Sequence, residues 1–403
     1  MFPGSLLKCS IFIAAIAIVV ALISSGSYAV SSYSFNAGLK PNYTIFPFYK
    51  SGYSFSIGPR ISSVDSYGVT WSGPIQITKS LINKDRPSIV QTPSFGPLQV
   101  ITNWVFWQSK DANDLYYVLS HDGKGLSWTT DQAIVTAGDN YRPASAVVRY
   151  GSSYSLWLVW SSKIGGPGYD IFNKSFSENQ PFDWQWANDE RMEFSTGYDA
   201  EPSIIRDSNG TIWIAWASID PLNPASGLDI CLNYSTNNGL TWNSVSDRLR
   251  GIGSSRETYP ALAEICISGQ KKILIAFQSD MLGGDNEIYC YIYDPGSGFS
   301  PLSQVTINNE EDLHPTILRR QNDEIWIAWE NKPNTYSNGE IYYAISQSNG
   351  QFWDLPAVDI SNSAKDDRYP SMTQTWDGKI WIVWSSNRDA NNYYQIFGAY
   401  GKK

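Results

Sequence analysis

The sequence is poor in the residues that most often build metal and redox sites. It has 4 cysteines and 2 histidines among 403 residues, and it contains no CxxC or HExxH motif. Cys9 lies in an N-terminal apolar segment, so Cys231, Cys266 and Cys290 remain beyond it. This odd and sparse set does not make a disulfide framework. We expect three buried thiols with room for one bridge among them, and no transition-metal site.

Long apolar runs are absent except at the N-terminus. Lys8 precedes an apolar core of 13 residues at 11–23, and the small-residue sequence SSGSYA follows. This layout predicts a signal peptide at residues 1–29, cleaved after Ala29. An uncleaved anchor is the alternative, but the core is shorter than the roughly 20 residues needed to cross a bilayer. We expect a secreted protein, extracellular or in the cell envelope, without membrane insertion after cleavage. Four Asn-x-Ser/Thr sequons suit an exported glycoprotein: Asn42, Asn173, Asn209 and Asn233.

Excess positive charge is also missing. The chain carries 29 basic and 38 acidic residues, a net charge of −9, and cleavage would remove Lys8 and no acid, giving −10. A surface this acidic argues against nucleic acid and anionic membranes as partners.

A tryptophan-rich motif recurs instead. TIWIAW (211–216) returns as EIWIAW (324–329), with related runs at 104–107, 156–160, 273–277 and 380–384. A proline precedes each run, at intervals of 56, 59, 58, 55 and 55 residues: Pro87, Pro143, Pro202, Pro260, Pro315 and Pro370. Each repeat reads as four short strands separated by Gly/Asn/Asp/Ser turns. The period and strand count predict an all-β fold, a six-bladed β-propeller of four-stranded antiparallel blades over 61–403.

The two chain ends should meet in one blade. The sixth repeat stops before a fourth strand, whereas SVDSYGVTW (63–71) stands before the first repeat and copies the fourth-strand pattern of SHDGKGLSW (120–128). We therefore predict that the N-terminal strand closes the last blade and leaves no open sheet edge. Residues 30–60 fall outside the period, and we predict an extension packed on the propeller.

The fourth-strand turns resemble a known repeat. STNNGLTW (235–242) and SQSNGQFW (346–353) are similar to the Asp-box, or bacterial neuraminidase repeat, of pattern Ser-x-Asp-x-Gly-x-x-Trp. The resemblance implies a sialidase-like propeller. Sialidases of that superfamily are glycosidases with a tyrosine nucleophile, a partner glutamate, an aspartate acid/base and three arginines that hold the sugar carboxylate. Their first arginine lies in an Arg-Ile-Pro motif, to which Arg368-Tyr369-Pro370 is the nearest equivalent here.

Repetition also separates blade residues from site residues. Acidic residues open the third strand in five of six repeats, which favours a structural role. The position before the proline instead holds four residue types: Arg86, Arg142, Glu201, Tyr259, His314 and Tyr369. We call these six the mouth residues, because they should converge at one mouth of the central channel and suit a polar or anionic ligand. The alternative is a solvated rim of paired charges. Their variety predicts that substitutions there spare the fold.

Our leading hypothesis is binding of a carbohydrate or cell-surface protein at this mouth by a monomer. Candidate ligand-binding residues are Arg86, Arg142, Arg368 and His314. The rival is an exo-sialidase-type glycoside hydrolase with Tyr259, Tyr369 and Glu201 as catalytic residues, which requires the three arginines to converge beside a tyrosine and a carboxylate. A structural envelope module is a third hypothesis, favoured by a plugged channel. No cofactor is expected; Ca²⁺ would fit only the acidic loop 279–287, where a solvated loop is favoured.

Overall fold

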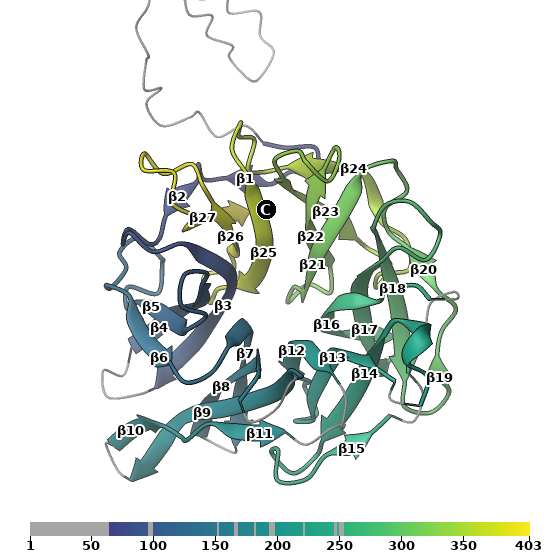
Figure 1. Cartoon of the computed structure of the whole chain (residues 1–403), viewed down its shortest axis with the longest axis horizontal. Helices are drawn as coiled ribbons and strands as arrows, with labels where there is room; N and C mark the ends of the chain where they lie inside the picture. The colour runs from purple at the N-terminus through teal and green to yellow at the C-terminus, as the bar shows by residue number, and fades with distance from the viewer. Residues whose placement is uncertain are drawn as a thin grey trace, which may run out of the picture. The chain divides into compact units, whose positions relative to one another are not determined.

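The computed structural model describes residues 64–403 except 96–99, 151–152, 165–167, 181–182, 193–197, 221, 246–247 and 250–253. The predicted signal peptide, the predicted extension at 30–60 and the sequon at Asn42 lie outside the described residues. Within them, six antiparallel sheets of four or five strands are arranged around a central channel, as Figure 1 shows. The predicted six-bladed β-propeller is therefore confirmed. No helix in the described part of the chain is long and apolar enough to cross a membrane.

Blades are numbered in chain order, each from its innermost strand outward. The first holds β3 (Lys84–Phe95), β4 (Val100–Ser109), β5 (Leu115–Ser120) and β6 (Gln132–Val135). The second holds β7 (Asn140–Tyr150), β8 (Ser153–Ser162), β9 (Asp170–Gln180), β10 (Asp183–Trp186) and β11 (Glu190–Met192). The third holds β12 (Asp199–Arg206), β13 (Ile212–Ile219), β14 (Leu228–Ser235) and β15 (Asn243–Ser244). A 3-10 turn, η1 (Pro224–Ser226), precedes β14.

The remaining blades follow the same plan. The fourth holds β16 (Thr258–Ile267), β17 (Gln270–Ser279), β18 (Glu287–Asp294), β19 (Gly298–Phe299) and β20 (Ser303–Gln304). The fifth holds β21 (Glu311–Arg319), β22 (Ile325–Lys332), β23 (Glu340–Ser346) and β24 (Asp354–Asp359). The sixth holds β25 (Asp367–Gln374), β26 (Ile380–Ser386) and β27 (Gln395–Lys402), with β1 (Thr70–Trp71) and β2 (Ile75–Gln76) at its outer edge.

The sixth blade joins the two ends of the described chain. Thr70 pairs with Lys402 and Trp71 with Gly401, and β2 pairs further along β27. The carboxylate of Asp65 accepts hydrogen bonds from the backbone N–H groups of Tyr67 and Val69 and from the indole of Trp71, which fixes the turn before this strand. The predicted closure by the N-terminal strand is confirmed.

The tryptophan-rich runs form the second strand of each blade and build the core between blades. Nearly all residues of β4, β8, β13, β17, β22 and β26 are buried, because neighbouring blades cover both faces of the sheet. Trp107, Trp160, Trp326, Trp381 and Trp384 are among the largest fully buried side chains. The cysteines beyond residue 63 are free thiols; Cys231 and Cys290 are buried, whereas Cys266 is half-buried.

Three of the acidic residues that open the third strands bond to the outer strand of their blade or to the chain that follows it. Glu287 accepts a hydrogen bond from the N–H of Asn308, and Glu340 accepts bonds from the N–H and hydroxyl groups of Ser363 and Ser361. Asp170 forms an ion pair with Arg191 at 2.8 Å. These contacts connect the third strands of the second, fourth and fifth blades to segments at the outer edge, as expected for a structural position.

Candidate functional site

The six mouth residues share one backbone conformation. Their φ angles lie between 49° and 63°, in the left-handed region that non-glycine residues rarely adopt. At each of them the register between the first and second strands shifts, in all six blades. Such a bulge redirects a side chain relative to its strand. The fold therefore presents six side chains at equivalent places around one end of the channel.

Five of these side chains contact one another around and across the channel axis. The guanidinium of Arg142, on the second blade, lies 3.2 Å from the ring centroid of Tyr259, on the fourth. The ring of His314 lies 4.1 Å from the rings of both Tyr259 and Tyr369, measured between centroids. Arg86 is the last member of this row of contacts and donates a hydrogen bond of 3.1 Å from Nη2 to the hydroxyl of Tyr369. The mouth residues thus close the channel at this end and form the floor of the mouth face.

The backbone of four of the bulges is held by a side chain of the blade before it. In three cases the acceptor is the second-strand side chain that directly follows the inner aromatic residue. These bonds run from the N–H of Glu201 to Ser161 (2.9 Å), of His314 to Gln278 (2.7 Å) and of Tyr369 to Glu330 (3.3 Å). The equivalent residue of the third blade is Ala217, whose methyl side chain cannot accept a hydrogen bond. There the carboxylate of Glu201 accepts the N–H of Tyr259 instead, at 2.9 Å.

Glu201 also forms the ion pair of the site. Its Oε2 lies 3.2 Å from Nη1 of Arg142, and about nine-tenths of each side chain is buried. Burial raises the pKa of Glu201, while Arg142 and Arg86 oppose that rise. Removing Arg142 would leave a buried carboxylate without its cation. This buried ion pair argues against the sequence-based expectation that substitution of Arg142 spares the fold, and we expect Arg142→Ala to destabilise the protein.

Two of the three candidate arginines come together. The guanidinium groups of Arg86 and Arg142 lie 5.7 Å and 5.6 Å from the ring of Tyr141, which both of them share. Nε of Arg86 and Nε of Arg142 are buried without a hydrogen-bond acceptor, whereas Nη1 of Arg142 faces the carboxylate of Glu201. Buried donors of this kind are rare in native proteins and mark a place where a ligand oxygen can complete the bonding.

Arg368 lies at the edge of this group. Its Nε and Nη2 donate to the two carboxylate oxygens of Asp85 at 3.0 Å and 3.3 Å, and its guanidinium lies 3.7 Å from the ring of Tyr394. The same guanidinium is 5.6 Å from the ring of Tyr369. Arg368 is thus held in a bidentate ion pair, one blade away from Arg86.

His314 and Glu330 form a buried pair beside the arginines. Nδ1 of His314 lies 2.7 Å from Oε2 of Glu330. Burial, reinforced by Arg142 and Arg86, holds the pKa of His314 well below its usual value, so this imidazole is neutral. Burial raises the pKa of Glu330 to about 7, against the opposing effect of Lys332. Glu330 was not among the sequence-based candidates.

The tyrosine–glutamate pair implied by the sialidase resemblance is not formed by the candidates Tyr259, Tyr369 and Glu201. A tyrosine–aspartate pair lies beside Arg368 instead, where the hydroxyl of Tyr394 donates to the carboxylate of Asp366 at 2.7 Å. The hydroxyl of Tyr369 accepts from Arg86, and the carboxylates of Glu201 and Glu330 accept from backbone N–H groups instead. Burial raises the pKa of Tyr369, which keeps its hydroxyl protonated. The catalytic roles of Tyr259, Tyr369 and Glu201 remain predictions. No group of three or more His, Cys, Asp or Glu side chains in the described residues could hold a metal ion.

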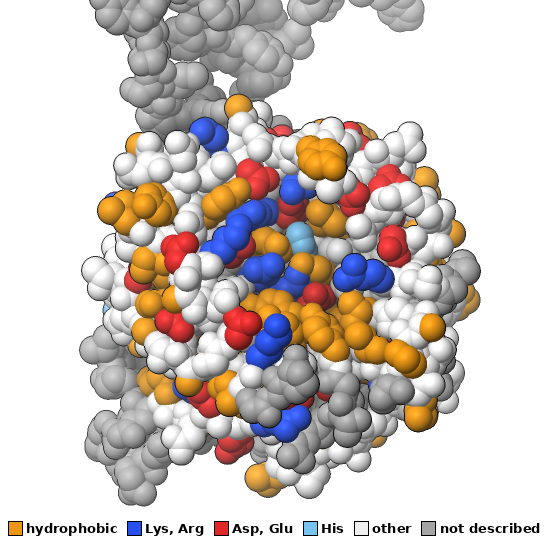
Figure 2. Space-filling model, viewed as in Figure 1, with side chains coloured by type: hydrophobic (Ala, Val, Ile, Leu, Met, Phe, Trp, Pro, Cys, Tyr) orange, Lys and Arg blue, Asp and Glu red, His pale blue; other side chains and the backbone are white. Residues whose placement is uncertain are grey.

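The mouth face combines both signs of charge. Figure 2 shows Lys and Arg side chains gathered around its centre, with acidic and hydrophobic side chains among them. The loops between the second and third strands surround this centre, and three of them carry exposed apolar side chains: Leu222, Leu282 and Tyr336. The positive centre contrasts with the overall charge of −9.

Known structures share this architecture. A protein of unknown function from Dyadobacter fermentans aligns with a TM-score of 0.64 and 14% identity over 83% of this chain and 99% of that one. The Trypanosoma rangeli sialidase in complex with 2,3-difluorosialic acid aligns with a TM-score of 0.54 and 14% identity over 84% of this chain. The match spans only 59% of that sialidase. The Penicillium chrysogenum α-L-arabinanase complexed with arabinobiose aligns with a TM-score of 0.54 and 14% identity, over 82% of this chain and 98% of the arabinanase.

At these identities the likeness is one of fold. The predicted sialidase-like propeller fold is confirmed, and arabinanases share it as well. No family model and no curated protein sequence matches the chain.

Proposed function

We propose that this is an exported lectin-like propeller that binds an anionic sugar of a glycan on its mouth face. Arg86 and Arg142 would hold the negative group of the sugar. The observation that carries the proposal is the pair of guanidinium groups around Tyr141, each with a buried Nε–H donor that lacks an acceptor. A carboxylate or sulfate oxygen supplies the charge-assisted acceptor that these donors lack.

Two further observations support a carbohydrate ligand. The solved structures with this fold include a sialidase in complex with 2,3-difluorosialic acid and an arabinanase complexed with arabinobiose. Partly exposed tyrosines also stand beside the arginines: Tyr141 and Tyr169 are 4.4 Å apart between ring centroids, and Tyr198 lies 5.6 Å from Tyr169. Aromatic rings with a polar edge suit the mixed apolar and hydroxylated faces of a sugar.

The test uses the full chain on an array of glycans with and without terminal sialic acid or sulfate groups. Arg86→Gln is the informative variant, because Arg86 is 22% exposed and its nearest carboxylate, on Asp85, is also held by Arg368. We expect binding of anionic glycans by the wild type and a loss of about 1.5–3 kcal/mol in Arg86→Gln, the typical worth of a charged hydrogen bond.

Arg149→Gln is the matched control. Arg149 is exposed near the opposite end of β7 from Arg142, so the same chemical change there should leave glycan binding unaltered. Equal binding of charged and neutral glycans, or equal losses in the two variants, would contradict the proposal. Release of the fluorophore from a fluorogenic sialoside would instead assign the site to a glycoside hydrolase. Binding only to protein-coated beads would favour a cell-surface protein as partner.

A further inference from the structure

The channel behind the mouth residues is a cavity with its own entrance. It has a volume of about 740 Å³, within the ~300–1,000 Å³ of sites that hold small molecules. The innermost strands of all six blades line it, from the mouth residues at one end to Arg206, Glu264, Arg319, Arg320, Gln321 and Asp323 at the other. From Glu201 to Arg206 along β12, five residues of strand span about 17 Å.

The cavity opens on the face opposite the mouth. At the mouth end none of its lining residues is exposed, and side chains from the first, second, fourth, fifth and sixth blades contact one another there. At the other end Gln321 and Asp323 are exposed at the turn between β21 and β22. A molecule that enters from this second face would not pass the proposed glycan site.

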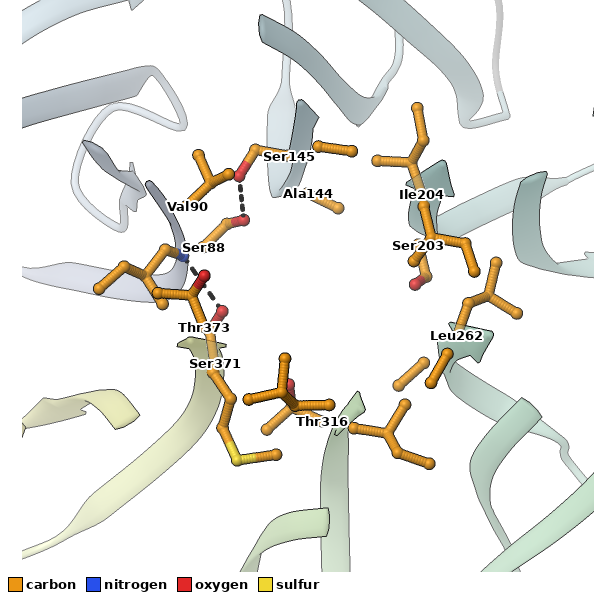
Figure 3. A pocket seen from close by; sticks show the side chains of 18 of the residues that line it. Ser88, Val90, Ala144, Ser145, Ser203, Ile204, Leu262, Thr316, Ser371 and Thr373 are labelled. Carbon is orange, nitrogen blue, oxygen red and sulfur yellow. Dashed lines mark hydrogen bonds between the residues drawn. The ribbon is translucent and has the colours of Figure 1, made fainter. Parts of the chain in front are cut away.

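The walls between the two ends carry no charge. Figure 3 shows aliphatic side chains around the space, including Val90, Ile204 and Leu262, interspersed with small hydroxylated ones. Part of the hydroxyl bonding is already satisfied, because Ser88 and Ser145 bond to each other at 2.8 Å and Ser371 accepts the N–H of Ile89. Such walls favour an uncharged, largely apolar chain over a charged one, since a charge there would lose its hydration without compensation.

Among the described residues, one arginine at the open end has no carboxylate partner. Arg319 is paired with Asp323 and Glu264, and Arg320 with Glu324. Arg206, by contrast, donates only a 3.5 Å hydrogen bond to the carbonyl of Asp207, and its Nε is buried without an acceptor. A carboxylate at the entrance would complete the bonding of this guanidinium.

We infer that the channel is a binding site for a linear aliphatic carboxylate, which enters from the face opposite the mouth. The alkyl chain lies between the aliphatic walls, and the carboxylate stays at the entrance against Arg206. This arrangement buries the apolar part of the ligand and leaves its charge paired and hydrated at the rim. The carboxylate of the ligand lies at the opposite end of the cavity from Arg86 and Arg142, so the inference does not depend on the proposed glycan site.

The experiment measures binding of dodecanoate to the full chain by calorimetry, beside dodecanol as the uncharged analogue. We expect wild-type protein to bind one dodecanoate per chain. Arg206→Gln should weaken dodecanoate binding about tenfold or more and leave dodecanol binding unchanged. No saturable binding to the folded wild-type protein, or equal effects of Arg206→Gln on both ligands, would overturn the inference.

A second pair of variants tests whether the ligand occupies the channel. The hydroxyl of Ser203 projects toward the open space in Figure 3. Ser203→Phe should fill the channel and abolish dodecanoate binding, whereas Ser203→Ala keeps the space open and should retain it. The melting temperature of each variant reports whether it folds. Retained binding in a folded Ser203→Phe protein would place the ligand on the outer surface and refute the channel site.

Discussion

The guanidinium of Arg142 lies 3.2 Å from the ring centroid of Tyr259, although the two residues belong to the second and fourth blades. Arg142 therefore extends across the position of the third blade, where Glu201 supplies its ion-pair partner. This contact is possible only because the bulge turns each mouth residue toward the axis. It makes one arginine a component of both the folded state and the candidate site, and the two roles need separate tests.

A double-mutant cycle separates them. Arg142→Gln should cost about 3–5 kcal/mol of unfolding free energy, because it leaves the buried carboxylate of Glu201 without its cation, and Glu201→Gln is the second single variant. The double variant Arg142→Gln/Glu201→Gln removes both charges and should recover much of that stability, but it should still lack affinity for anionic glycans. Urea unfolding and glycan binding measure the two effects. Equal destabilisation by the single and double variants would show that the ion pair does not govern folding.

Asp170→Ala is the counterpart of this cycle in a blade position. Asp170 opens the third strand of the second blade, two strands outward from β7, which carries Arg142. Its carboxylate is paired with Arg191. Its loss should lower the melting temperature and leave glycan affinity at the wild-type level. A variant with unchanged melting but no glycan binding would reverse the division into blade and site residues.

Glu330 predicts a pH dependence of stability. Burial raises the pKa of this carboxyl from 4.5 to about 7, so the folded state favours its protonated form. Stability is then greatest below the unfolded pKa and falls as pH rises through about 7, by on the order of 3 kcal/mol. Glu330→Gln mimics the protonated form. Its stability relative to the wild type should therefore rise between pH 5 and pH 8, as followed by urea unfolding.

His314 provides the internal check on that measurement. Its imidazole is neutral in the folded protein, because its pKa is held well below the usual value, and it stays present in both proteins being compared. Nδ1 of His314 lies 2.7 Å from Oε2 of Glu330, so the two titrations are coupled, and the same comparison in a His314→Gln background isolates the carboxyl. A difference that does not change with pH would show that Glu330 is ionised in the folded protein throughout this range.

Deletion of residues up to Trp71 should open the sixth blade. The change removes β1 and exposes the backbone of β27, which pairs with Thr70 and Trp71 in the intact protein. Unpaired strand edges promote association. We expect a lower melting temperature and concentration-dependent oligomers in light scattering. A truncated protein that stays monomeric and melts at the wild-type temperature would show that this seam contributes little.

The predicted signal peptide has a direct chemical test. N-terminal sequencing of protein recovered from the medium or envelope of an expressing cell should give a sequence beginning near Val30. Material that still begins at Met1 would contradict cleavage and favour a membrane anchor.

The repeats were sufficient to predict the blades and the closing strand, because strand pairing follows a local pattern that the sequence repeats six times. They also identified the six mouth residues, whose variety stood out against constant neighbours. Contacts across the axis were beyond the same reasoning. The distance from Arg142 to Tyr259 depends on how two non-adjacent blades are placed, and no spacing along the chain encodes it.

Two residues of the site were missed, and the sequence held a signal for one of them. Glu330 follows the inner aromatic of the fifth blade, at a position that is Gln108, Ser161, Ala217, Gln278 and Ser385 in the others. This position varies as much as the mouth position, so the same comparison between repeats would have found it. Tyr141 directly precedes Arg142 in the chain, but its place between two arginines is a property of packing alone.

The shared left-handed backbone of the mouth residues has an evolutionary consequence. Holding an unbranched non-glycine residue at a φ near 55° costs on the order of 1–2 kcal/mol, and none of the six mouth residues is β-branched. Each blade therefore already bears this cost, and one mouth side chain can replace another without a new backbone penalty. The propeller in effect offers six exchangeable positions on a constant frame. Recognition can diverge by single substitutions there, one blade at a time, wherever no buried ion pair such as that of Arg142 and Glu201 links two of them.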